Sequence, residues 1–484
     1  MSDFLAGAGL LLAVGASAAA ILLPAGRPRS AAMAMAMALF PVLIIGDQWH
    51  TAQIVDLRHD EWRIVVLLAI AVLAIGVLAI FFRPWPIAIP LAVIVALPFR
   101  VPLEAGGDTA NLLVPLYLVI AAGVVAVGAR DWGRRSAGPV SSTWLAKVLA
   151  AVVVLYALQT LYSEDFSKGL QNVCFFLVPF TVAFGLLQDV EWDGRLLRWA
   201  LILVGIEASA FVVIGSVEFL TGSLYWNDQI IRSNEFHTYF RVNGVFWDPN
   251  VYGRYLALVT TVAAAALLWV RTRESFWLLS GLILVLWIGL VPTYSQSSFL
   301  ALLAGLAMLA AIRWNWRWTL VVVAVCSVGA VLVVLLAGGS GKITSDRLNV
   351  DLSGRGSLIS GGLDLFAERP VWGYGAGGFQ SAYGEHRENP DAPVTISHTE
   401  PVTVAAEQGL IGLIAYLLLI SVALRTMSAG LLNGNAARAA VLAAFVALLV
   451  HTLAYAGFFE DPITWVLLAV GASLAAAPAV RDPA

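Results

Sequence analysis

Polar residues that could bind an anion stand just before an apolar run in the middle of the chain. Arg241 is followed by Asp248-Pro249-Asn250, and Arg254 comes four residues later. Aspartate often caps the N-terminus of a helix and proline suits its first position, so the pattern predicts a helix that begins at Pro249. A helix N-terminus flanked by arginines is a natural site for phosphate. Ordinary capping, with both arginines reaching the membrane interface, is an equally good interpretation of these residues taken alone.

A second polar stretch could carry acid–base chemistry. It contains Arg347 and Arg355 and ends at His398 and Glu400, before another apolar run. A lone histidine is more often structural, but it is the side chain best suited to proton transfer near neutral pH, and the two arginines make His398 our candidate general base. Glu400 and the intramembrane Glu407 are competing bases, since an ionisable group inside a span usually has a function or a partner. A buried hydrogen bond to a neighbouring helix is the structural alternative for Glu407.

A glycine-dense segment, 368–379, lies between these arginines and His398. Glycine adopts backbone conformations that are closed to other residues and allows the backbone to approach another group closely. We therefore expect this segment to turn tightly and to be able to approach a ligand.

The composition places these residues in a membrane protein. The chain has 484 residues, of which 60% are hydrophobic and only 12% are charged, whereas about a quarter of the residues of a soluble domain are charged. The net charge of −3 is too small to indicate nucleic-acid binding. Cys174 and Cys326 both fall in apolar runs, so we expect no disulfide and no cysteine-based metal site. We expect no cofactor.

The elements that must position these residues are membrane-spanning helices, each of which needs about 20 apolar residues. The sequence predicts an all-α, polytopic helix bundle of about 12–15 spans, with a long outer loop before the third-last span. The fifteen candidate spans lie near 4–24, 31–46, 63–82, 86–103, 111–129, 143–161, 170–188, 198–221, 251–270, 277–292, 297–312, 318–337, 402–424, 436–458 and 462–479.

The distribution of lysine and arginine predicts the orientation. The run Phe4–Leu23 has no basic residue before it, so we expect a retained helix with its N-terminus outside rather than a signal peptide. In that orientation the inner loops hold sixteen of the 28 basic residues and the short outer loops hold four. The other eight lie in or beside two long loops, 222–250 and 338–401, which both fall outside.

Three segments together resemble the O-antigen ligase and O-antigen polymerase superfamily. The first is 241–253, with its arginine, glycine and Pro249-Asn250 pattern ahead of a span. The second is Gly354-Arg355 with the glycine-dense segment, and the third is His398 followed by the Gly-x-x-Gly at 409–412. The likeness covers about residues 220–425. It implies N-terminal helices at 1–221, a ligase-like or polymerase-like core at 222–425, and C-terminal helices at 426–484.

The resemblance implies inverting glycosyl transfer at the outer face of the plasma membrane. The donor would be a glycan on a polyprenyl pyrophosphate, and the acceptor a hydroxyl of another glycan or of a glycolipid. Positive charge would stabilise the pyrophosphate leaving group without a metal, and His398 would take the acceptor proton. The residues expected to bind the pyrophosphate are Arg241, Asn250, Arg254, Arg347 and Arg355.

Three alternatives stay open at this point. A ligase and a polymerase run the same chemistry on different acceptors, so the sequence does not separate them. A different type of membrane glycosyltransferase uses acidic residues and often a metal in an early outer loop, and the segment 47–61 is acidic but short. A transporter without catalysis would have charged, broken helices near the middle of the membrane. Large polar outer loops with arginines and a histidine fit an enzyme better.

Overall fold

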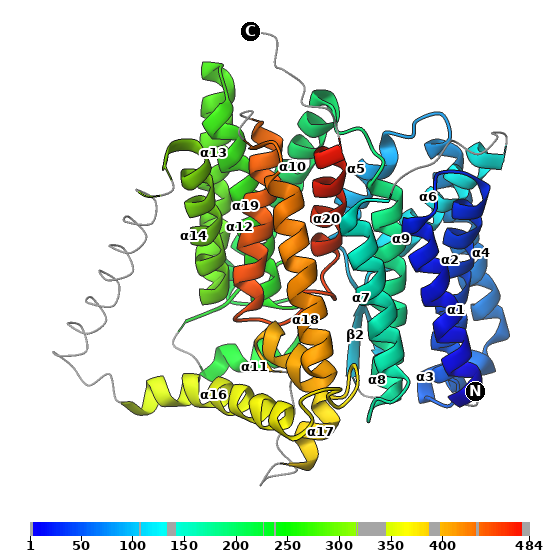
Figure 1. The fold of residues 1–484 in the computed structure, drawn as a ribbon. Helices are drawn as coiled ribbons and strands as arrows, with labels where there is room; N and C mark the ends of the chain where they lie inside the picture. The colour runs from blue at the N-terminus through cyan, green and yellow to red at the C-terminus, as the bar shows by residue number, and fades with distance from the viewer. Residues whose placement is uncertain are drawn as a thin grey trace.

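The computed structural model describes residues 3–105, 108–132, 142–225, 227–236, 239–315, 317, 345–386, 397–431 and 435–476. These residues form an all-α bundle with one small β-hairpin, and its long helices run roughly side by side (Figure 1). Ten described helices are long and apolar enough to cross a membrane, and three more apolar helices, α7, α19 and α20, have 15 to 17 residues. The expected all-α polytopic fold is confirmed.

The bundle helices are α1 (Asp3–Leu22), α2 (Arg27–Asp47), α4 (Glu61–Phe82), α6 (Val114–Trp132), α7 (Trp144–Thr160), α8 (Phe166–Asn172), α9 (Val178–Leu187), α10 (Gly194–Thr221), α12 (Pro249–Trp269), α13 (Arg273–Leu290), α14 (Gln296–Ala310), α18 (Glu400–Ser428), α19 (Ala436–Thr452) and α20 (Pro462–Ala476). A π-helical turn, Val173–Leu177, joins α8 to α9, and another, Ala311–Asn315, follows α14. The shorter elements are α3 (Ala52–His59), α5 (Ala88–Ala96), α11 (Asp228–Phe236), the 3₁₀ turn Val291–Thr293, α16 (Ser345–Glu368), α17 (Phe379–Glu385), and the antiparallel strands β1 (Val101–Ala105) and β2 (Asp108–Leu112).

The predicted spans agree with these helices except at two places. The span expected at 86–103 contains only the nine-residue helix α5. Leu97 caps it with helical backbone angles, but the next residue, Pro98, has no backbone N–H to continue the helical hydrogen bonds, so the chain leaves the helix and enters β1. The span expected at 318–337, with Cys326, lies outside the described residues. Cys174 is a buried free thiol.

Apolar contacts hold the bundle together in two main clusters. The larger lies where α1, α2, α6, α7, α9 and α20 meet, and the second surrounds α12 together with α10 and α13. At the periphery, α4 has the highest mean hydropathy of the candidate spans, 3.3, yet only 6% of its most apolar stretch is buried. That combination fits a helix surrounded mainly by lipid.

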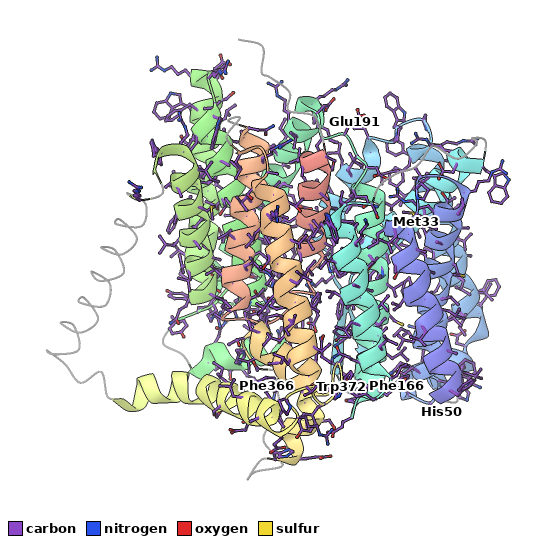
Figure 2. The ribbon with its side chains drawn as sticks, viewed as in Figure 1. Met33, His50, Phe166, Glu191, Phe366 and Trp372 are labelled. Carbon is purple, nitrogen blue, oxygen red and sulfur yellow. The ribbon has the colours of Figure 1, made fainter. Side chains whose placement is uncertain are left out.

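The described parts of the two long loops lie at the same end of the bundle as the N-terminus. Figure 1 places α11 and α16 at this end, with α16 lying across the bundle. The labelled His50, Phe166 and Trp372 mark the same end, whereas Glu191 marks the opposite one (Figure 2). The structure thus agrees with the expected sidedness of these loops relative to the N-terminus.

Candidate functional site

The helix expected after Asp248 begins where the sequence predicts. Asp248 caps α12 by accepting a hydrogen bond from the backbone N–H of Asn250 at 2.6 Å, and Pro249 is the first helical residue. The other carboxylate oxygen of Asp248 accepts from the hydroxyl of Tyr455 at 3.1 Å. The N-terminus of α12 is therefore fixed from two sides.

Arg241 is held beside this helix N-terminus. Its Nε donates to the carbonyl of Thr293 at 3.0 Å, and its Nη2 donates to Oδ1 of Asn250 at 3.1 Å. Within the described part of the chain, Arg241 forms no ion pair. A half-buried cation without a carboxylate, next to the positive end of a helix, is suited to bind an anion.

Glu218 of α10 positions the loop that carries Arg241. Its side chain is fully buried and its Oε2 accepts from the backbone N–H groups of Asn243 at 3.1 Å and Gly244 at 2.7 Å. Gly244 has a φ of +56°, a conformation that favours glycine. Sequence reasoning missed Glu218, although a carboxylate near the end of a span was a signal available to it.

Arg254 lies about one turn after Asn250 in α12, and it is paired with a carboxylate. Its Nε is 3.0 Å from Oδ2 of Asp461, and the two side chains are 4% and 3% exposed. The contact is electrostatic rather than a well-aligned hydrogen bond, and Nη1 of Arg254 has no hydrogen-bond partner among the described residues. Arg100 lies close to both groups, and burial lowers its pKa from the ordinary arginine value. The structure thus brings Arg254 near Asn250, but in a buried ion pair.

Two further ionisable residues inside the helices also have partners. Glu207 of α10 accepts from the hydroxyl of Tyr255 at 2.8 Å. His451 of α19 lies 3.1 Å from the hydroxyl of Ser297, measured from its Nε2. Pairing of this kind is the usual state of an ionisable group inside a membrane protein.

The glycine-dense segment completes a break in α18. Gly409 has a φ of +63°, which interrupts the helix and leaves backbone groups without helical partners. The carbonyl of Glu407 accepts from the N–H of Gly375 at 2.7 Å, and the N–H of Leu410 donates to the carbonyl of Pro370 at 2.7 Å. A Cβ at Gly375 would lie 2.2 Å from Cα of Ser163. The close backbone approach expected here is therefore made to α18 and to the turn after α7.

Glu400 and Glu407 bind backbone groups in the same way as Glu218. Oε2 of Glu400 accepts from the N–H groups of Gly457 at 2.7 Å and Phe458 at 3.0 Å. Oε2 of Glu407 accepts from Gly377 at 2.9 Å, and its Oε1 accepts from Phe379 at 3.2 Å. Each carboxylate thus fixes a glycine-containing loop to the bundle, as Glu218 does. For Glu407 this is a buried hydrogen bond, as in the structural alternative, and its partners are a loop residue, Gly377, and the first residue of α17, Phe379.

His398 lies at the mouth of α18, as the sequence predicts. It is half-buried and precedes Thr399, which occupies the N-cap position without a side-chain cap hydrogen bond. Arg347 and Arg355 belong to α16, which packs against α18, and their side chains are outside the described set. The backbone therefore brings α16 to the region of His398, whereas Arg241 and Asn250 form a separate contact at α12.

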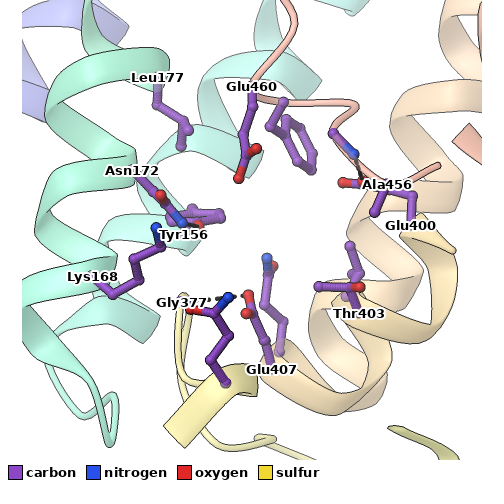
Figure 3. A pocket seen from close by; sticks show the side chains of 15 residues that line it. Tyr156, Lys168, Asn172, Leu177, Gly377, Glu400, Thr403, Glu407, Ala456 and Glu460 are labelled. Carbon is purple, nitrogen blue, oxygen red and sulfur yellow. Dashed lines mark hydrogen bonds between the residues drawn. The ribbon is translucent and has the colours of Figure 1, made fainter. Parts of the chain in front are cut away.

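A small cavity of about 50 Å³, lined in part by polar side chains, lies beside the first turns of α18 (Figure 3). Glu400, Thr403 and Glu407 line it from α18, and Glu460 faces them from the loop before α20. Lys168 of α8 closes it on the side of α7 and α8. The remaining lining residues are Tyr156, Asn172, Leu177, Gly377, Gln380, Val404, Gln408, Ala456, Gly457 and Phe459.

The comparison with known proteins concerns the part of the site that α16 and α18 form. No curated protein matches the chain. A family match covers residues 281–417, which include α14, α16, α17, His398 and the first half of α18, whereas Arg241, Asn250 and Arg254 precede it. The matching family model is described as O-antigen ligase, so residues 281–417 are similar to that family, and two of the three segments singled out in the sequence lie within the match.

Proposed function

We propose that this protein transfers a glycan from a polyprenyl-pyrophosphate donor to a hydroxyl of a glycan or glycolipid acceptor, at the outer face of the plasma membrane. The family match supports glycan ligation or polymerisation in general. The observation that carries the specific proposal is Arg241, a half-buried cation held at the N-terminus of α12 by Thr293 and Asn250. Such a group is suited to the charge that develops on a departing pyrophosphate.

In the proposed reaction the acceptor oxygen attacks the anomeric carbon while the bond from that carbon to the pyrophosphate oxygen breaks. The configuration at the anomeric carbon is inverted. Polyprenyl pyrophosphate leaves with the bonding electron pair, and Arg241 together with the dipole of α12 stabilises its negative charge. We assign Arg347 and Arg355 of α16 to the same anion, and Asn250 and Arg254 to positioning and charge at the start of α12.

His398 is the proposed general base that takes the proton of the acceptor hydroxyl. Glu400 and Glu407 are the competing bases, but each already accepts two backbone hydrogen bonds. These hydrogen bonds hold two loops against the bundle, so we assign the two glutamates to shaping the site and His398 to the role of base.

The proposal includes an orientation and a division of the chain. With the N-terminus outside, both long loops face the outer side, where lipid-linked glycans and their acceptors meet. Residues 222–425 would form the catalytic core, flanked by helices 1–221 and 426–484. A ligase is favoured over a polymerase because the matched family is described as O-antigen ligase. In a deletion strain, free polymer without attachment would indicate a ligase, and single repeat units would indicate a polymerase.

The test uses the purified chain with a polyprenyl-pyrophosphate-linked glycan donor and measures release of polyprenyl pyrophosphate. Arg241→Ala should lose one or two charge-assisted hydrogen bonds to the leaving group, about 1.5–3 kcal/mol each, or roughly tenfold to a hundredfold in rate per bond. Arg241→Lys should recover only part of this, because lysine lacks the planar fork of donors. Arg195→Ala, an exposed arginine in the first turn of α10, is the matched control. Full activity of Arg241→Ala would remove Arg241 from the site.

His398→Ala is the second arm of the test. It should lower the transfer rate by about two to four orders of magnitude, while donor binding survives. The wild-type rate should fall as acid protonates the imidazole. Near-normal turnover of His398→Ala together with an inactive Glu400→Gln or Glu407→Gln would show that a carboxylate is the base. A transporter would release no polyprenyl pyrophosphate in any variant.

A further inference from the structure

The cavity beside α18 contains polar side chains that the bundle itself leaves without partners. Lys168, Gln408 and Glu460 line it, and none of the three side chains forms a hydrogen bond or ion pair with the described residues. Gln408 is only 5% exposed, so an amide without a partner at this depth is costly unless another molecule binds it. Groups of three different chemical types, none paired with the described residues, therefore line one cavity.

Hydrogen bonds hold several other groups of the cavity wall in place. The backbone hydrogen bonds described above fix the carboxylates of Glu400 and Glu407. Nδ2 of Asn172 donates to the hydroxyl of Tyr156 at 3.1 Å, which fixes that hydroxyl oxygen. The aromatic ring of Phe459 supplies apolar surface to the same space. A preformed pocket with a few convergent polar groups is the usual form of a small-molecule subsite.

The charges of the cavity restrict what it can bind. Three carboxylates, those of Glu400, Glu407 and Glu460, would repel an anion such as phosphate. The ammonium of Lys168 would repel a cation, and no group of three or more acidic, histidine or cysteine side chains in the described ranges is arranged to hold a metal ion. A neutral hydroxyl satisfies both kinds of group, since it donates to a carboxylate and accepts from an ammonium or an amide.

We infer that this cavity binds sugar hydroxyl groups of one of the two glycan substrates. The inference rests on the proposed function, which supplies the glycans, and adds to it a binding subsite. A volume of about 50 Å³ accommodates a few water-sized groups, so the cavity takes the hydroxyl-bearing edge of a sugar and not a whole oligosaccharide. The cavity begins at Glu400, two residues after His398, so a sugar held there lies close to the proposed base.

The experiment is steady-state transfer by the purified full chain, with donor extracted from membranes of the source strain and acceptor extracted from a strain that lacks this protein. Lys168→Met and Glu460→Gln each remove one cavity group. Lys147→Met, in the first turn of α7, and Glu191→Gln, at the end of the bundle opposite the N-terminus, remove matched exposed charges (Figure 2). Ala456→Val fills part of the cavity without removing a polar group. Thermal unfolding in detergent checks that each variant is folded.

Both charge variants and the filled variant should raise the KM for one substrate roughly 10- to 100-fold, while kcat changes by less than about threefold and the controls behave as wild type. A rise for the acceptor assigns the cavity to an acceptor sugar, and a rise for the donor assigns it to a donor sugar. If folded cavity variants keep both KM values, whether or not kcat falls, the cavity holds only water and the inference is wrong, while the proposed function stands. Failure of the wild type to release polyprenyl pyrophosphate would instead refute the proposed function.

Discussion

The buried ion pair between Arg254 and Asp461 offers a sharp test of the structure. The two side chains are 4% and 3% exposed, so neither charge can be compensated by water. Removing one partner of such a pair typically costs about 3–5 kcal/mol, because the remaining charge is buried without a counter-charge. Arg100 lies close to the same carboxylate and to Arg254. Loss of Asp461 therefore leaves two neighbouring cations without that carboxylate, whereas loss of Arg254 leaves Asp461 near Arg100.

We accordingly expect Asp461→Asn to lower the free energy of unfolding by about 3–5 kcal/mol, and Arg254→Met to lower it by less. The double variant, Arg254→Met with Asp461→Leu, should be more stable than Asp461→Asn, because an apolar pair of similar volume avoids the desolvation of both charges. Unfolding of the purified chain in mixed micelles, titrated with sodium dodecyl sulfate, measures these differences. Equal stability of Asp461→Asn and the wild type, or a greater loss in Arg254→Met, would refute the reasoning.

Three further predictions test the kink, the outer surface and the topology. Gly409→Ala should destabilise the chain by about 1–3 kcal/mol or more, because its Cβ would lie 2.3 Å from the carbonyl oxygen of Val371. Gly281→Ala is the control, since a Cβ there would have nothing within 4 Å and should not destabilise the chain. Thermal unfolding compares the two variants. A hydrogen bond to the backbone carbonyl of Ala382 and, after it, the carboxylate of Glu368 raise the pKa of His386. The ion pair between His386 and Glu368 should therefore be fully formed below about pH 6.5 and be lost as the pH rises through the raised pKa. Hydrogen exchange of α16 and α17 should then increase with pH beyond its intrinsic rise in the wild type but not in His386→Gln. Single cysteines in the 338–401 loop of a cysteine-free variant should react with an impermeant reagent from outside, and labelling only after permeabilisation would reverse the orientation.

The membrane class, most helices and the start of α12 could be predicted from the sequence. About 20 consecutive apolar residues are enough to predict a spanning helix, and two or three residues are enough to predict a helix cap, so neither prediction depends on distant parts of the chain. The exception at α5 is also local, since Pro98 ends the helix after nine residues. The family motifs at Gly354-Arg355 and His398 are likewise patterns of neighbouring residues. The sequence therefore pointed to the superfamily before the helices were placed.

The partners of the buried polar groups depended on the tertiary structure. The sequence marked Arg254 and Glu407 as ionisable groups inside the membrane, but not that Asp461 pairs with the first or that backbone N–H groups of a glycine-dense loop bind the second. These partners lie in other segments of the chain, and only the packing of α12, α18 and α20 brings them within hydrogen-bonding distance. The cavity has the same origin, because its walls come from four helices, a π-helical turn and two loops. Hydropathy and capping act between neighbours along the chain, whereas the cost of burying an unpaired polar group is relieved only by residues that the fold brings together.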